Sequence, residues 1–263
     1  MVDYDRNASV PRSGSSFNGA GLGINTQAQV DQGLRTYMLG VYNNMVIGLG
    51  ITGLVALGLY MMSVSGTGGT LRSGAELTEF GRFLYTSPFK YVLMFAPLGV
   101  VLYLGFKVNS MSASTARITF FAYAALMGAS LSILGLVYAH SSIARVFFIT
   151  SATFGSLSLY GYTTKRDLSG MASFLMMGLF GLMIGSIVNI FLGSSTMQWI
   201  ISIVGVLLFA GLTAYDTQNI KEMYFEGDMQ ETAAKKSILG ALQLYMDFIG
   251  MFQMLMSLMG NRD

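Results

Sequence analysis

The chain has 263 residues, of which 53% are hydrophobic and only 11% are charged, whereas soluble domains carry roughly 25% charged residues. This composition excludes an ordinary soluble protein and predicts an integral membrane protein surrounded by a lipid bilayer. The net charge of +2, with dispersed basic residues, gives no support for a nucleic-acid partner. The absence of cysteine excludes disulfides and thiol catalysis, and a single histidine, His140, excludes a multi-histidine metal site within one chain.

The N-terminal 35 residues are polar and rich in Gly, Ser, Asn and Gln, without an apolar run. We expect a disordered polar tail over residues 1–35, ending in a short interfacial helix near residues 27–35. The remainder, residues 36–260, is predicted to form one transmembrane domain.

Seven apolar stretches in this domain approach or exceed the length of about 20 residues that a membrane-spanning helix requires. The predicted fold class is therefore an all-α integral membrane protein with seven transmembrane helices. Between the first two spans, residues 75–85 have the pattern of a short amphipathic helix lying on the membrane. The predicted spans cover residues 36–62, 89–106, 118–139, 146–164, 171–192, 199–216 and 237–260, and a charged loop at 221–236 separates the last two.

The distribution of Lys and Arg between alternate loops predicts the orientation of the chain. Ten basic residues lie in the tail and the even-numbered loops, and five lie on the other side. Because cytoplasmic loops carry the excess of Lys and Arg, we expect a cytoplasmic N-terminus and an external C-terminus.

Two carboxylates, Asp216 and Asp247, lie inside the last two apolar stretches. Ionisable groups in a membrane span are costly and are usually functional. If the sixth span ends near Phe225 and the seventh begins near Ser237, both aspartates lie roughly 13 to 15 Å from the cytoplasmic ends of their helices. We therefore expect the two carboxylates at matched depth on neighbouring antiparallel helices.

Small and polar residues recur at three-four spacing on both helices and indicate which sides face each other, because such residues mark helix–helix contacts in a bilayer. This interpretation makes Asp216 and Asp247 a facing pair. Thr213, Asn219, Gln243 and Tyr245 are the predicted supporting polar groups. The facing residues are Gly240, Gln243, Asp247, Gly250, Met254 and Ser257 on the last helix, and Ser202, Gly205, Phe209, Thr213, Asp216 and Asn219 on the one before it.

Two close carboxylates in a low-dielectric site do not easily both ionise. The pair is therefore predicted to switch between a shared-proton state and a doubly charged state that attracts a cation. Oxygen-only ligands favour a hard ion such as Ca²⁺, bound weakly or transiently because two carboxylates make an incomplete cage. No tightly bound cofactor is expected.

Two other interpretations of the aspartates remain open at this point. Hydrogen bonds from neighbouring hydroxyl groups could hold each aspartate in a purely structural role. Alternatively, a salt bridge to Lys107, Arg117 or Lys221 could act as a latch that keeps the helix bundle closed.

Enzymatic activity is not expected. The sequence has no set of nucleophile, base and acid, no H-E-x-x-H motif and no phosphate-binding loop. An intramembrane aspartyl protease would place its aspartate in G-x-G-D, whereas Asp216 follows A-Y and Asp247 follows Y-M.

The two aspartate motifs resemble those of the Bax inhibitor-one family, in particular its bacterial members. The matching strings are G-L-T-A-Y-D-T-Q-N-I at 211–220 and L-x-L-Y-M-D-F-I-x-x-F-x-x-L-M at 242–256, with R-T-Y-M-L-G-V-Y-N-N-M at 35–45 and S-P-F-K-Y-V at 87–92. The resemblance implies six helices around a central seventh, in a bacterial inner membrane. It also implies a pH-sensitive Ca²⁺ leak in which Asp216 and Asp247 are the proton sensor and gate, with Lys107 as the nearest equivalent of a basic latch.

The same resemblance supplies the alternative function, a non-conducting regulator that binds a membrane quality-control protease. Its contact surfaces would be the polar tail and the charged loop at 221–236.

Overall fold

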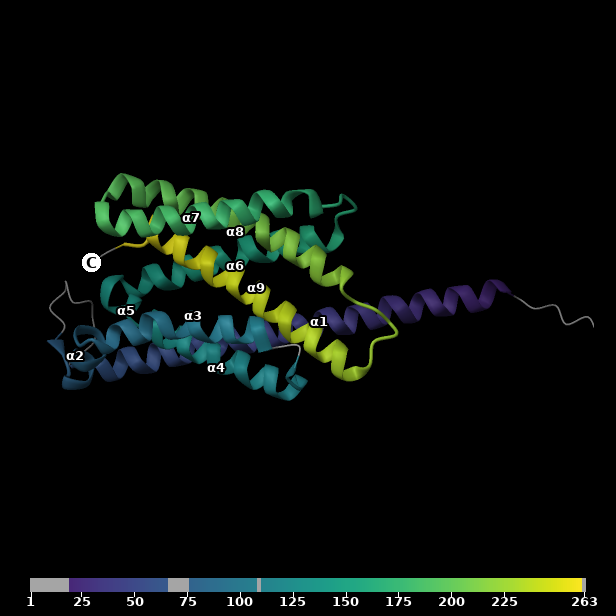
Figure 1. The fold of residues 1–263 in the computed structure, drawn as a ribbon, viewed down its shortest axis with the longest axis horizontal. Coiled ribbons are helices and arrows are strands. Elements are labelled where there is room, and N and C mark those ends of the chain that lie inside the picture. Colours follow the sequence, from purple (N-terminus) through teal and green to yellow (C-terminus); the bar gives the residue numbers. More distant parts are fainter. Residues whose placement is uncertain (1–18, 66–75, 108–109, 262–263) are drawn as a thin grey trace, which may run out of the picture.

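The computed structural model describes residues 19–65, 76–107 and 110–261, and it describes side chains from residue 31 onward. Within these ranges nearly all of the chain is helical (Figure 1). Seven of the helical segments are long and apolar enough to cross a membrane, as predicted. The elements are α1 Gly19–Ser63, β1 Val64–Ser65, β2 Glu76–Leu77, α2 Glu79–Thr86, α3 Phe89–Lys107, α4 Ala113–Leu131, α5 Leu134–Val137, α6 His140–Thr163, the 3₁₀ helix η3 Ser169–Met171, α7 Ala172–Leu192, α8 Ser195–Glu222 and α9 Gln230–Met259.

The helices extend further into polar sequence than the apolar stretches alone predicted. The first helix begins at Gly19 and the last at Gln230, so residues 19–35 are helical and the predicted loop at 221–236 shortens to residues 223–229. The reason is local propensity, since Gln, Glu, Ala and Lys at 230–236 favour helix even in water. Residues 1–18, the rest of the predicted tail, lie outside the described residues.

The loop between the first two spans contains the predicted amphipathic helix, observed as α2. Its N-cap is Thr78, whose side chain accepts a hydrogen bond from the backbone N–H of Gly81. A short antiparallel pairing of β1 with β2, which the sequence did not indicate, closes the loop. On the other connections, α7 ends at Gly193, whose φ of 61° is the left-handed conformation that favours glycine after a helix.

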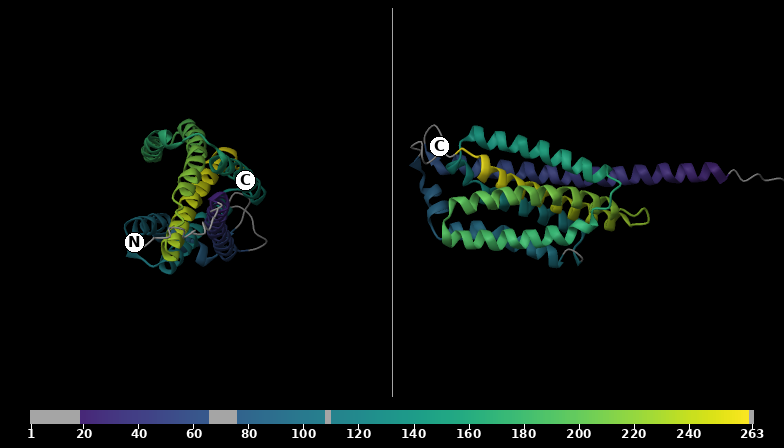
Figure 2. Two further views of the ribbon diagram at one scale, coloured as in Figure 1. Left: turned by 90° about the vertical axis from the view of Figure 1, so that its right-hand side faces the viewer. Right: turned by 90° about the horizontal axis from the view of Figure 1, so that it is seen from above.

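The long helices form two groups that α9 connects. In one group α1 and α3 pack against α4, and in the other α6 and α7 pack against α8. The last helix crosses diagonally between the groups and contacts α1, α4, α6 and α8 (Figures 1 and 2). The N-terminal part of α1 and the end of α9 lie at opposite ends of the bundle (Figure 1), as an odd number of spans requires.

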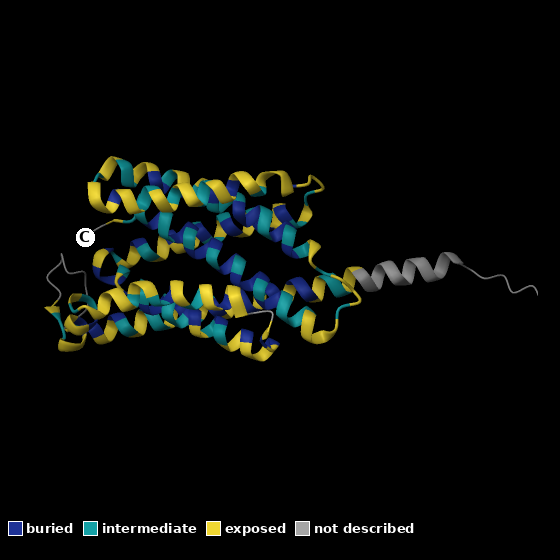
Figure 3. Ribbon diagram, viewed as in Figure 1, coloured by how far each residue is buried: buried dark blue, intermediate teal, exposed yellow. Residues whose placement is uncertain are grey.

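Burial separates α9 from the other spans (Figure 3). Of its most apolar window 72% is buried, whereas no other candidate span exceeds 44%. Large apolar side chains point outward from the outer helices, for example Phe106 and Phe191, which are 85% and 84% exposed. Exposed apolar surface of this extent would be unstable in water, so it is the surface that contacts lipid, and α9 forms the centre of the protein core.

Candidate functional site

The candidate site lies where α8 and α9 pack against each other in antiparallel register. A Cβ added to Gly240 would clash with Ile220, and one added to Gly250 would clash with the ring of Phe209. The small residues therefore let the two backbones approach closely. Further along, Gly205 contacts Met254, and the hydroxyl of Ser202 donates to that of Ser257 at 3.0 Å. These contacts confirm the facing sides predicted from the spacing of small and polar residues.

The two aspartates meet in this interface. The carboxyl groups of Asp216 and Asp247 lie within hydrogen-bonding reach of each other. Ionised carboxylates only accept hydrogen bonds, so a hydrogen bond between the two groups requires one proton. The arrangement is one in which two carboxyl groups can share a proton.

The protein encloses Asp247 and half-buries Asp216. Asp247 is only 5% exposed, and its Oδ2 has no hydrogen-bond partner among the described residues. Neither aspartate lines the two cavities described below. Within the described part of the chain, no group of three or more His, Cys, Asp or Glu side chains could hold a metal ion. A cation at this site would thus have two carboxylates and no third acidic ligand.

The axial positions of the aspartates differ from those predicted. Asp216 lies six residues before the end of α8 at Glu222, and Asp247 lies seventeen residues after the start of α9 at Gln230. At 1.5 Å per residue these offsets are about 9 Å and about 26 Å, so the matched depth measured from the helix ends was wrong. The carboxylates meet because α9 crosses α8 diagonally and begins well beyond the apolar stretch (Figure 1).

The four predicted supporting groups occupy different surroundings. The Thr213 hydroxyl donates to the carbonyl of Phe209 in its own helix at 2.7 Å. The Tyr245 hydroxyl lies 2.6 Å from that of Thr52 on α1, so it joins α9 to α1 and does not contact the aspartates. Asn219 and Gln243 are half-buried on α8 and α9. Their place beside the aspartates and a role for them stay predictions.

The predicted cationic latch is not engaged in this conformation. Lys107 and Arg117 are exposed. The Nζ atom of Lys221 donates to the carbonyl of Tyr162 at 2.9 Å and lies over that ring. A latch involving Lys107 or Arg117 would therefore belong to a different conformation.

A chain of hydroxyl groups between α1, α6 and α8 was missed by the sequence analysis. The Tyr42 hydroxyl on α1 lies 2.7 Å from that of Ser158 on α6, which in turn lies 2.9 Å from that of Thr217 on α8. We call these three residues the hydroxyl chain. The sequence pattern that could have indicated it is the four-residue spacing of Thr150, Phe154 and Ser158, which lie buried on one face of α6. The hydroxyl chain connects three helices, and its member Thr217 directly follows Asp216 in the sequence.

Comparison with known proteins agrees with this architecture. The model of the family described as "Inhibitor of apoptosis-promoting Bax1" matches residues 34–263. The chain is 41% identical to the Rickettsia prowazekii protein RP147, over 100% of this chain and 99% of that protein. It is also 41% identical to the Escherichia coli inner membrane protein YbhL, over 88% of this chain and 93% of that protein. A Caulobacter vibrioides protein is 42% identical over 89% of this chain and 92% of its own length.

Proposed function

Because the chain belongs to the Bax inhibitor-one family of integral membrane proteins, we propose that it is a proton-controlled cation leak protein with calcium as the transported ion. The observation that carries the proposal is the close approach of the Asp216 and Asp247 carboxyl groups, with Asp247 buried, in the interface of α8 and α9. The inner membrane location follows from the similarity to YbhL. Buried ionisable groups in membrane spans mark ion or proton pathways more often than structural contacts.

The shared proton acts as the closing element. It allows the two carboxyl groups to attract each other and keeps α8 and α9 in close contact. When the proton leaves, two negative charges about 4 Å apart repel by about 4 kcal/mol at an effective dielectric constant of about 20. That energy favours a second arrangement in which the carboxylates separate, so loss of the proton shifts the closed and open populations.

The doubly charged pair then attracts a cation. Carboxylate oxygens are hard ligands that suit Ca²⁺. Calcium usually takes six to eight oxygen ligands, and two carboxylates supply at most about four. Binding is accordingly weak, which suits an ion that must leave the site again. The release of one proton on opening makes the flux rise with pH.

Calcium flux into liposomes at several pH values tests this mechanism. The wild-type protein should show a flux that increases as the pH is raised. Asp216→Asn and Asp247→Asn should each remove most of that pH dependence, because an amide donates a hydrogen bond to the remaining carboxylate without a titrating proton. Asp167→Asn is the matched control, since Asp167 is exposed in the turn before η3 and accepts hydrogen bonds from the neighbouring Ser169.

Two results would count against the proposal. Unchanged flux and unchanged pH dependence in both aspartate variants would remove the pair from the mechanism. Absence of calcium flux in the wild-type protein at every pH would favour the alternative function, a non-conducting regulator that binds a membrane protease.

The charged segment at 221–236, the contact surface expected for that alternative, is largely exposed, and some of its charges are paired within the protein. Lys236 forms a salt bridge with Asp228 at 2.6 Å and donates to the carbonyl of Met223. The Glu231 carboxylate accepts from the backbone N–H of Ala113 at the start of α4 at 2.6 Å, where the helix dipole favours a negative charge. These charges stabilise the loop itself, and a protease would bind the remaining exposed residues of the segment, such as Phe225 and Met229.

A further inference from the structure

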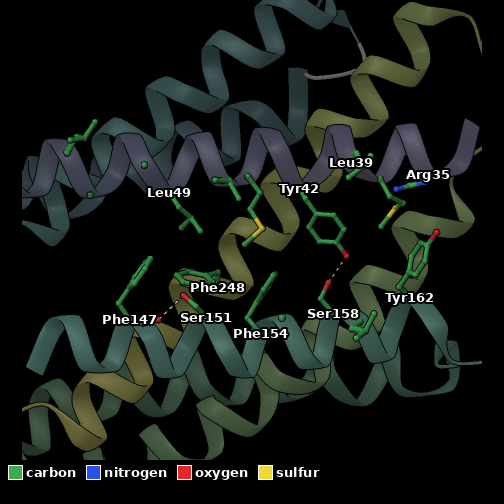
Figure 4. Close-up of a pocket in the computed structure, with 18 of the residues that line it drawn as sticks. Arg35, Leu39, Tyr42, Leu49, Phe147, Ser151, Phe154, Ser158, Tyr162 and Phe248 are labelled. Atoms are coloured by element: carbon green, nitrogen blue, oxygen red, sulfur yellow. Dashed lines mark hydrogen bonds between the residues drawn. The ribbon is translucent and has the colours of Figure 1, made fainter. Parts of the chain in front are cut away.

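A groove separates α1 from α6 within the membrane-spanning part of the protein (Figure 4). Its volume is about 1050 Å³, which is at the upper end of the roughly 300–1,000 Å³ typical of ligand pockets. Side chains of Leu49 and Tyr42 on α1 and of Phe154 on α6 point into it, and Phe248 on α9 forms part of its floor (Figure 4). The groove is open to the side, where the surrounding phase is lipid.

The groove is as long as the membrane is thick. It follows α1 from Arg35 to Leu57, which is about 33 Å at 1.5 Å per residue, against roughly 30 Å for the hydrocarbon core of a bilayer. A second cavity of about 570 Å³ continues it toward Tyr60 and shares Gly53 and Phe248 with it. An extended, flexible and apolar ligand matches this shape.

Glycines open the groove. A Cβ added to Gly50 or Gly53 on α1, or to Gly155 on α6, would meet no protein atom within 4 Å. These three glycines line the groove without being required by helix packing. The space they leave is therefore available to a molecule from the membrane.

The polar groups are unevenly placed along the groove. Arg35 and Tyr162 lie together at the end nearest the start of α1, whereas the opposite end is lined mostly by apolar side chains, and its Ser151 hydroxyl donates to the Phe147 carbonyl of its own helix (Figure 4). Arg35 is exposed and has no ion pair with any residue that the structure describes. A cationic group at one end of a long apolar groove is complementary to an anionic amphiphile.

We infer that this groove is a binding site for an anionic phospholipid. One acyl chain lies between α1 and α6, and the phosphate of the headgroup contacts Arg35. The guanidinium group forms paired hydrogen bonds with phosphate oxygens, and the Tyr162 hydroxyl is available at the same end. The lipid completes the packing between the two helix groups on the side where α9 is their main connection.

Photolabelling of the full-length protein in nanodiscs tests this inference. The probes are phosphatidylglycerol and phosphatidylcholine carrying a diazirine on one acyl chain, and labelled peptides are mapped by mass spectrometry. Phosphatidylglycerol should label residues 38–57 and 147–159 well above the outward faces of α3 and α7. Phosphatidylcholine should label the groove less. Equal labelling of all outward helix faces by both lipids would show ordinary boundary lipid and overturn the site.

Matched variants distinguish the groove from the surrounding lipid. The double substitution Gly53→Leu and Gly155→Leu fills the groove and should reduce its labelling to that of α3. Gly99→Leu is the control, since Gly99 is exposed on α3 and also has no neighbouring atom within 4 Å. Undiminished labelling in the double variant, or cross-links to a second protein chain in place of lipid, would refute the proposal.

The headgroup contact has its own test. Arg35→Gln should lower groove labelling by phosphatidylglycerol about fivefold, because one basic residue near an anionic surface contributes about 1 kcal/mol. Labelling by phosphatidylcholine should change less. Arg166→Gln removes an equal charge from the exposed turn after α6 and should leave both labels unchanged. Equal effects of the two arginine variants would reject Arg35 as the headgroup contact.

Discussion

The shared proton between Asp216 and Asp247 predicts that the protein loses stability as the pH rises. In the proposed closed state, the folded protein holds a proton between two carboxyl groups that are separated in the unfolded state. Stability falls with pH wherever the folded state binds more protons than the unfolded state. This contribution is thus present in acid and is lost when the proton leaves the pair. Asp247→Asn should remove the effect, because the amide keeps the hydrogen bond without a proton.

The size of the expected stability change follows from the contact between the two carboxyl groups. Two charges about 4 Å apart repel by about 4 kcal/mol at an effective dielectric constant of about 20. One kcal/mol shifts the melting temperature of a chain of this size by roughly 2–4 °C. The melting temperature of the wild-type protein should therefore fall by on the order of 10 °C between acidic and alkaline buffer, beyond any change seen in Asp247→Asn.

Thermal unfolding in nanodiscs, followed by far-ultraviolet circular dichroism, measures this difference. Asp167→Asn controls for the loss of an aspartate outside the membrane and should follow the wild-type curve. If Asp247→Asn loses as much stability with pH as the wild-type protein, the carboxyl groups do not share a titrating proton, and the reasoning behind the gate is refuted.

Two further predictions concern packing around the pair, and the same unfolding measurement checks both. Ser158→Ala removes the middle of the hydroxyl chain and should lower the free energy of unfolding by about 1 kcal/mol. Ser156→Ala is the control and should change this free energy little, because the exposed Ser156 hydroxyl bonds only its own helix. Equal effects of the two variants would show that the hydroxyl chain does not stabilise the fold. Gly250→Leu places a side chain against Phe209 in the α8–α9 contact and should cost about 1–3 kcal/mol. Gly181→Leu on the exposed face of α7 should be tolerated, and tolerance of both would contradict the close approach of α8 and α9.

Much of the fold could be predicted because the bilayer limits what the chain can do. Lipid offers no hydrogen bonds, so each span must be an apolar helix of defined length, and such helices are visible as uncharged stretches. Loop charges are less informative about helix ends. Residues 230–236 were assigned to a loop because they are charged, yet their helix-forming side chains extend α9.

The facing of the aspartates was also accessible from the sequence. Helices in lipid associate through small and polar residues, so the spacing of Gly240, Asp247 and Gly250 indicates the contact side of α9, and the short connection makes α8 its neighbour. The comparison of the depths of Asp216 and Asp247 along their helices also predicted this pair, but it assumed incorrect helix ends. It did not account for the diagonal crossing, which depends on how α9 packs against α1, α4 and α6 as well.

The sequence by itself determined the class of protein, the seven spans and the two aspartates as the principal charges inside them, because each of these depends on local composition or periodicity. The tertiary structure alone decided which groups surround the pair. It brings Tyr42, Ser158 and Thr217 together from positions up to 175 residues apart, it leaves Lys107 and Arg117 on the surface, and it opens the groove between α1 and α6. These features depend on the relative positions of several helices, and side-chain packing across the whole bundle sets those positions.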